Sequence, residues 1–162
     1  MAAKKKAARR KPAKPAKPAR PAKKRARRKK PETLRLRTAS PGLTVNDLDK
    51  SLAFYRDVLG FVVGDLWKQD GKVLGAELKA GHISFMIGQD DWKKGRDRMK
   101  GVGVRLYCTT AQDVDQLAGQ VKARGGVLAH EPVTQPWGMR DFGIADPDGF
   151  NITIQGPAKT KR

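Results

Sequence analysis

The pattern of hydrophobic positions changes once early in the globular part of the chain, from a period of two to a helical period. Alternation of apolar and polar residues over 36–45 predicts a strand. Apolar side chains then recur at helical spacing from Leu48 to Leu59. Asn46 is the expected N-cap of this helix, and Gly60 is expected to end it.

Three strands are expected to follow this helix, because β-branched and aromatic residues cluster there between turn signals. Asp70-Gly71 is a strong signal for a two-residue hairpin turn, and Ala80-Gly81 marks the next turn. The strands are predicted over residues 61–67, 72–78 and 82–87. Together with the first strand and the helix, they make a βαβββ unit.

The same order of elements is predicted a second time. A polar and charged stretch over residues 89–101 lacks periodicity and is interpreted as a linker or lid. The second set is a strand, a helix and three strands, predicted over residues 102–109, 112–123, 127–130, 139–145 and 150–155. Two prolines favour a loop over 131–137, and Asp-Pro-Asp-Gly at 146–149 predicts a turn.

A constant offset relates the two sets of elements. Asp47 corresponds to Asp113, and Gly60 to Gly126, each 66 residues further on. An offset that holds at both a helix start and a helix end indicates internal duplication. We therefore predict an α+β fold in which two βαβββ modules form a cupped mixed sheet.

Charge divides the chain into regions of different character. The sequence carries 35 Lys and Arg against 16 Asp and Glu, a formal net charge of +19, yet residues 1–30 contain 16 of the basic residues and no acid. Residues 31–158 are balanced in charge. The predicted organisation is a disordered tail rich in Lys, Arg, Pro and Ala over 1–33, a globular domain over 34–157 and a basic end over 158–162.

Composition argues against two classes of protein. No run approaches the roughly 18 apolar residues that a membrane span needs. The single cysteine, Cys108, can form neither an internal disulfide nor a cysteine-based zinc site. We therefore expect a protein of the reducing cytoplasm.

The tail has the chemistry of a segment that binds polyanions. Prolines and cations both recur at every third residue, so a polyproline II conformation would line cations along one edge. No aromatic residue is available for base stacking, which predicts sequence-independent binding to nucleic acid and association with the nucleoid. A solubilising charge run and a transit peptide are the alternatives. The residues expected to contact phosphates are Lys11, Lys14, Lys17, Arg20, Lys23, Lys24, Arg25, Arg27, Arg28, Lys29 and Lys30.

Several short motifs of the globular part resemble one superfamily. The module signatures of the vicinal oxygen chelate superfamily are similar to residues 45–47, 54–61, 101–107, 113–115, 136–142 and 146–150. That superfamily contains glyoxalase I, ring-cleaving dioxygenases, fosfomycin-resistance enzymes and bleomycin-resistance proteins. The resemblance covers about residues 36–156, and the second half is closest to the bleomycin-resistance-like branch.

The resemblance also implies where a metal ion would be held. Enzymes of the superfamily bind a divalent metal with His and Glu side chains, one from the first and one from the last strand of each module. These positions fall on Ser40, near Phe85 with its neighbours Ser84 and Met86, on Val104 or Leu106, and on Thr153. None of them is His, Glu or Asp, so neither a metal nor another cofactor is expected. Ligands relocated to His82 or His130 are the alternative.

Without a metal, the concave side of the sheets becomes a candidate site for a small organic ligand. Alternation puts Asn151 and Thr153 on that side of the last strand and apolar Ile152 on the other. Phe85 and Trp137 are expected to supply apolar walls, and Arg140 a fixed cation. The predicted ligand-binding residues are Ser40, Phe85, Trp137, Arg140, Asn151 and Thr153. The alternative is that side chains fill the cup.

Three functions therefore compete. The first is metal-free binding of a small molecule, of the bleomycin-resistance type, by a homodimer that its tail tethers to nucleic acid. The second is a metal-dependent lyase, transferase or dioxygenase with unrecognised ligands. The third is an architectural protein whose tails bridge DNA segments. We favour the first, and we expect Cys108 and the 146–149 carboxylates to be structural.

Overall fold

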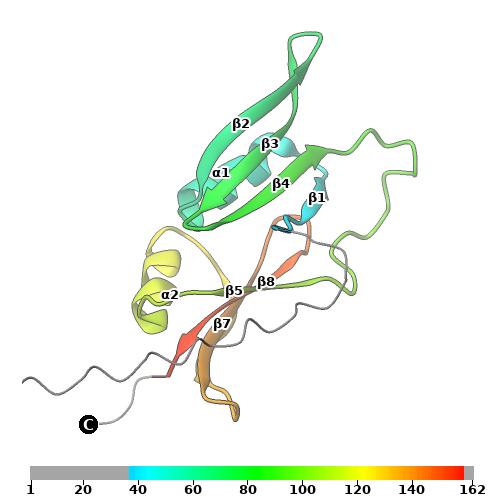
Figure 1. Cartoon of the computed structure of the whole chain (residues 1–162). Helices are drawn as coiled ribbons and strands as arrows, with labels where there is room; N and C mark the ends of the chain where they lie inside the picture. The colour runs from blue at the N-terminus through cyan, green and yellow to red at the C-terminus, as the bar shows by residue number, and fades with distance from the viewer. Residues whose placement is uncertain (1–36, 159–162) are drawn as a thin grey trace, which may run out of the picture. The chain divides into compact units, whose positions relative to one another are not determined.

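The computed structural model describes residues 37–158, and the predictions for the tail and for the basic end beyond Ala158 lie outside this range. The described part contains two four-stranded mixed sheets, each with its own helix (Figure 1). The predicted α+β fold is therefore confirmed. No helix in residues 37–158 is long and apolar enough to cross a membrane.

The two modules have the same order of elements. The first module consists of β1 (Gly42–Val45), α1 (Leu48–Ala53) with a π-helical continuation η1 (Phe54–Val58), β2 (Val62–Gln69), β3 (Lys72–Ala80) and β4 (Ile83–Gln89). The second consists of β5 (Arg105–Thr109), α2 (Val114–Ala123), β6 (Leu128–Thr134), β7 (Met139–Ala145) and β8 (Asn151–Pro157). The predicted duplication is thus present in the structure.

Both sheets also have the same topology. The strand order is β1-β4-β3-β2 in the first sheet and β5-β8-β7-β6 in the second. In each sheet the first strand of the module pairs in parallel with the last, and the other neighbours are antiparallel. The first and last strands of each module therefore lie side by side, and three of the candidate site residues, Phe85, Asn151 and Thr153, are on these strands.

Each sheet has one face in the hydrophobic core. On β4, Phe85 and Ile87 are buried, whereas Met86 between them is 42% exposed. On β8, Ile152 is buried and its neighbour Asn151 is exposed. Because successive side chains of a strand point to opposite faces, this alternation separates a core face from a more polar concave face.

The start of α1 differs from its prediction by one residue. Asp47, rather than Asn46, is the N-cap, since its backbone is extended and its carboxylate accepts the Lys50 amide at 3.0 Å. Asn46 instead donates its backbone amide to Asp148 at 3.0 Å. Asn and Asp are equally good N-caps, so local preference could not choose between adjacent residues. Asp113 caps α2 in the equivalent way.

Two strand boundaries near prolines differ clearly from prediction. β1 begins at Gly42, whereas a strand was predicted from residue 36, and Pro41 just before it has no N–H to donate to a partner strand. β6 reaches Thr134, where a proline-containing loop was predicted over 131–137. This strand is at the edge of its sheet, and Pro132 lies in the register shift between His130 and Val133. A missing N–H at such a position removes no ladder hydrogen bond, which explains why the strand tolerates proline.

The linker between the modules, residues 90–104, contains no helix or strand. It was predicted over 89–101, and β5 begins at Arg105 instead of residue 102. Ion pairs within this segment nevertheless hold it together, because the Asp90 carboxylate lies 2.7 Å from both the Lys100 ammonium and the Arg98 guanidinium. The Lys100 ammonium also lies 5.0 Å from the ring centroid of Trp92. The hydrogen bond from Lys100 is the main reason that the pKa of Asp90 lies well below its usual value.

Candidate ligand-binding groove

The turn between β7 and β8 joins the two modules through buried polar contacts. The Tyr55 hydroxyl donates to Asp146 Oδ2 at 3.0 Å, and both residues are buried. Asp146 Oδ1 accepts the backbone amides of Asp148 and Phe150 at 3.0 and 2.8 Å. Asp148 in turn accepts the Asn46 amide from the first module. The carboxylates of this turn therefore set how the modules meet, which turn chemistry alone did not predict.

Burial changes the acidity of this pair. Desolvation raises the pKa of the Asp146 carboxyl, and its three hydrogen bonds oppose that rise only in part. Desolvation, together with the charge of Asp146, raises the pKa of the Tyr55 hydroxyl far above its usual value. Tyr55 is therefore a permanent hydrogen-bond donor to Asp146, not a proton-transfer group.

A groove of about 440 Å³ lies where the first sheet meets β5 of the second. Its lining comes from residues 39–41 before and at the start of β1, residues 83–85 on β4, and residues 105–108 on β5. The Ser40 and Ser84 hydroxyls are 2.8 Å apart and hydrogen-bond to one another. The groove thus brings together strands from both modules, as expected for the predicted cup.

Arg105 and Tyr107 point away from the core on β5. Leu106 and Cys108 pack against the hydrophobic core, so the residues between and before them lie on the opposite, concave face. Arg105 is exposed, and Tyr107 is 58% exposed. The groove therefore carries a guanidinium and a phenol on the strand to which the resemblance assigned a metal ligand.

The structure places three of the predicted binding residues on the concave side. Ser40 lines the groove. Asn151 and Thr153 pair in register with Arg105 and Tyr107, so they lie on the same face of the second sheet. The other three predicted residues lie elsewhere, each for a physical reason.

Phe85 is a core residue instead of a groove wall. Its ring is 3% exposed and packs against those of Tyr55 and Phe61, with centroids 6.2 and 5.3 Å away. It borders the groove through its place on β4, but the side chain is on the helix side. Ser84 and Met86, its neighbours, are the residues of β4 on the concave face.

Arg140 and Trp137 are also outside the groove. Arg140 lies on the helix side of β7 and binds the Asp115 carboxylate through two nitrogens, at 2.8 and 2.6 Å. This ion pair raises the pKa of the Arg140 guanidinium. Trp137 lies in the turn between β6 and β7 and is 65% exposed. Neither residue lines the groove. The predictions that Arg140 supplies a cation to the groove and Trp137 an apolar wall are therefore wrong.

Arg105 and Tyr107 are the groove residues that the sequence prediction missed. The register of this strand was uncertain by two residues, and Val104 or Leu106 was assigned to the ligand position. A signal was present, because residues 105, 107 and 109 are Arg, Tyr and Thr, whereas Leu106 and Cys108 are apolar. Period-two alternation therefore favoured the odd-numbered residues as the concave set.

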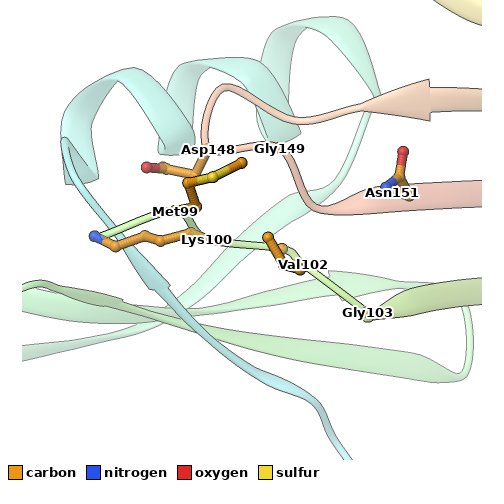
Figure 2. A pocket seen from close by; sticks show the side chains of 8 residues that line it. Met99, Lys100, Val102, Gly103, Asp148, Gly149 and Asn151 are labelled. Carbon is orange, nitrogen blue, oxygen red and sulfur yellow. The ribbon is translucent and has the colours of Figure 1, made fainter. Parts of the chain in front are cut away.

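A second, shallower hollow of about 370 Å³ lies where the linker packs against the β7–β8 turn (Figure 2). Its lining includes Met99, Lys100 and Asn151. The Lys100 ammonium is already bound by Asp90 and by the Asn46 side chain. A Cβ at Gly101 would overlap the Gly149 carbonyl, so the two segments touch there. The hollow is the edge of a packed junction, and the groove remains the candidate site.

The concave residues do not suit a divalent metal ion. The positions that the resemblance assigned to metal ligands carry serine and threonine hydroxyls or apolar side chains, and the nearby Arg105 guanidinium repels cations. Within residues 37–158, no three His, Cys, Asp or Glu side chains converge. His82 lies in the turn before β4 of the first module, whereas His130 is on β6 of the second module and packs against Gly143 of β7, so the two histidines are in different modules.

Paired βαβββ modules with a groove between their sheets define the class of this protein. The sequence model of the Glyoxalase/Bleomycin resistance protein/Dioxygenase superfamily matches residues 37–154, and the chain belongs to that superfamily. The resemblance seen in the motifs is thereby confirmed at the level of the superfamily. No curated protein sequence matches the chain.

Several solved structures share the fold. A virulence protein from Salmonella typhimurium is 22% identical, with a TM-score of 0.59, over 78% of this chain and 100% of that one. A glyoxalase/bleomycin resistance protein/dioxygenase from Nocardioides is 17% identical, with a TM-score of 0.61, over 81% and 90%. TioX from Micromonospora sp. is 18% identical, with a TM-score of 0.60, over 75% and 100%. At these identities the likeness extends to the fold alone.

Proposed function

We propose that the folded domain binds a small organic molecule in the groove between its sheets, without a metal ion. The observation that supports this most is the groove itself, which is lined by hydroxyls, a phenol and a guanidinium as well as apolar side chains. Such a mixture of apolar surface and a few polar groups is typical of organic ligand sites.

We further propose that the N-terminal segment holds this binder on nucleic acid. Its 16 cations in residues 1–30, with no acid, contrast with the balanced charge of residues 31–158. Neutralising roughly 6–10 phosphates would make binding fall about 10³–10⁵-fold between 50 and 200 mM salt. Tethering would raise the concentration of the binding domain near nucleic acid, which suits a ligand that acts there. A homodimer and a place in the bleomycin-resistance-like branch belong to the same proposal.

The metal content of the protein tests the first part of the proposal. The full chain, purified without chelator, should contain far less than one equivalent of nickel, zinc, manganese or iron. Stoichiometric metal that is lost on substitution of Ser84 or Thr153 would show that the superfamily's metal chemistry persists here. The mass of the particle in solution, measured by light scattering, decides between monomer and homodimer.

Salt dependence tests the second part. Binding of the full chain to a 30-base-pair duplex should weaken steeply with salt, and equally for unrelated sequences. A variant with glutamine at the eleven cations expected to contact phosphates should lose this binding but keep its small-molecule binding. Duplex binding that survives in that variant would contradict the assignment of the phosphate contacts to these eleven cations.

A further inference from the structure

We propose that the groove selects anionic ligands, namely a carboxylate on an aromatic or apolar body, and that Arg105 binds the carboxylate. This inference rests on the proposed function, because it assigns a ligand class to the same groove. It is carried by the position of Arg105, by the absence of a carboxylate beside it within the described chain, and by the hydroxyls that share the groove.

The backbone holds Arg105 in a defined place. It is the first residue of β5 and pairs in register with Asn151 of β8, while Leu106 next to it is packed against the core. A side chain on a paired strand has fewer backbone conformations to lose on binding than one on a loop. The guanidinium is therefore presented to the groove from a rigid element.

Arg105 differs from the arginines that form ion pairs with carboxylates within residues 37–158. Arg56, Arg98 and Arg140 each lie within 2.7 Å of a carboxylate oxygen. No carboxylate in residues 37–158 lies within ion-pair distance of Arg105, and no acid is among the residues that line the groove. The groove lining therefore carries an uncompensated positive charge, which attracts an anion and repels a cation.

Three other charged residues near the concave face, Glu77 and Lys79 of the first sheet and Asp141 of the second, do not cancel the charge of Arg105. Glu77 and Lys79 lie on β3, on the side opposite buried Leu78, and their charged atoms are 2.9 Å apart. They neutralise one another. Asp141 of β7 is 3% exposed and accepts a hydrogen bond from Gln135 at 2.9 Å, so it lies away from solvent in its own contact.

The other residues that line the groove add hydrogen-bond donors for the carboxylate and apolar surface for the rest of the ligand. The hydroxyls of Ser40 and Ser84 can donate to a carboxylate oxygen, and a guanidinium binds a carboxylate through two parallel hydrogen bonds. Tyr107 and Ile83 are 58% and 40% exposed and offer apolar contact beside these donors. A flat aromatic acid matches this arrangement, whereas a cationic drug of the bleomycin type would meet a like charge.

The two tyrosines of the chain provide a site-specific probe. Tyr107 lines the groove, and Tyr55 is fully buried in the core. Residues 1–36 contain no tyrosine, so ligand held by the tail does not directly perturb either signal. We therefore suggest 3-fluorotyrosine labelling of the full chain and fluorine NMR titration with 2-naphthoate, 2-naphthamide and 2-naphthylmethylamine. The Tyr55 resonance is the internal control for an intact fold.

The expected result is a saturable shift of the Tyr107 resonance that is strongest with 2-naphthoate. Arg105→Gln should weaken naphthoate binding about tenfold or more, the change that a lost charge-assisted pair produces. Arg105→Lys should weaken it less, since it keeps the charge but not the two-nitrogen geometry. Arg56→Gln, which removes an equal charge from an exposed pair with Asp57, should leave it unchanged.

Other outcomes separate this inference from the proposed function. Equal binding of naphthoate and naphthamide, or naphthoate binding that Arg105→Gln leaves intact, would overturn the anion selectivity while the groove remained a ligand site. Preference for the amine would reverse the inference. A Tyr107 resonance that none of the three compounds shifts, with Tyr55 unchanged, would overturn both the inference and the assignment of this groove as the binding site.

Discussion

The two modules share one topology but fill it with different side chains. The core of the first module contains an aromatic cluster, in which Tyr55, Phe61 and Phe85 are in mutual edge or tilted contact at 5.3–6.2 Å. The helix of the second module contributes Val114, Ala118 and Val121, which are small and aliphatic. A βαβββ unit therefore requires an apolar layer between helix and sheet, not a particular kind of side chain.

The helices differ in the same way. α2 is a regular helix of ten residues, whereas α1 has six and then widens into the π-helical turn η1. Within η1, the Leu59 amide donates to the Phe54 carbonyl at 3.2 Å, five residues back. Tyr55 lies in this turn, and its hydroxyl reaches Asp146 of the other module. The irregular helix thus belongs to the module whose aromatic core also makes the cross-module contact.

Truncation of the aromatic core should have the largest effect. Phe85→Ala is expected to lower the free energy of unfolding by about 3–5 kcal/mol, because it opens a cavity beside two other rings. Ile152→Val in the core of the second module, which removes only one methyl group, should cost only about 0.5–1.5 kcal/mol. Urea denaturation of both variants measures the difference, and a loss for Phe85→Ala no larger than that for Ile152→Val would contradict the importance of the aromatic cluster.

The cross-module hydrogen bond should come next. Tyr55→Phe is expected to cost about 1–3 kcal/mol, since it leaves a buried carboxylate oxygen of Asp146 without its donor. The folded pKa of Asp146 is raised, so folding binds a proton and this group lowers stability as pH rises from about 4 through the folded pKa.

Loss of the phenol removes an interaction that lowers this pKa, so the penalty of Tyr55→Phe should be smaller at pH 4 than at pH 7. Denaturation curves at the two pH values test the sign. A penalty that is independent of pH, or larger at pH 4, would contradict the assignment. Tyr107→Phe is the matched control, because that hydroxyl is on the exposed concave face.

The linker should show a local effect. Asp90→Asn leaves the buried Lys100 ammonium with a neutral partner, so residues 90–104 should become more sensitive to protease and exchange amide hydrogens faster, while the sheets stay protected. Because the pKa of Asp90 is lowered, the pair contributes stability at neutral pH and should keep it down to pH 4. Asp91→Asn, in an exposed pair with Lys93, is the control.

Arg140 should show the smallest effect on ligand binding. It is on the helix side of the second sheet and is bound to Asp115, whereas Arg105 faces the groove. Arg140→Gln should therefore leave the naphthoate affinity unchanged, in contrast to Arg105→Gln. The same fluorine titration measures both variants. A loss on Arg140→Gln that matches the loss on Arg105→Gln would show that the two faces are coupled.

Much of the fold could be predicted from local chemistry. The turn at Asp70-Gly71 is present, with positive φ at both residues, as a tight hairpin requires. Gly60 has positive φ just after its helix, consistent with its predicted role at the helix end, and Gly125 has positive φ after α2, one residue before the predicted counterpart Gly126. The boundaries of β7 agree with prediction at both ends. Such features depend on neighbours in sequence, which the chain itself displays.

Predictions for the site depended on distant neighbours and were less complete. Ser40, Asn151 and Thr153 were placed on the concave side because a motif or a simple alternation defined their strand faces. The predictions for Phe85 and Arg140 put these side chains on the wrong face of their strands. A shift of one residue in a strand moves a side chain to the opposite face of the sheet. Arg140 had a further partner, Asp115, which is 25 residues away in sequence.

The amino-acid sequence by itself determined the duplicated βαβββ order, the turns, the helix ends and the uneven distribution of charge. Each of these follows from backbone preferences and periodicity, which act over a few residues. Only the tertiary structure decided that β5 presents Arg105 to a groove shared with Ser40 and Ser84, and that Tyr55 meets Asp146 across the modules. Those contacts depend on strand register and on the packing of one module against the other, which arise only when the whole domain folds.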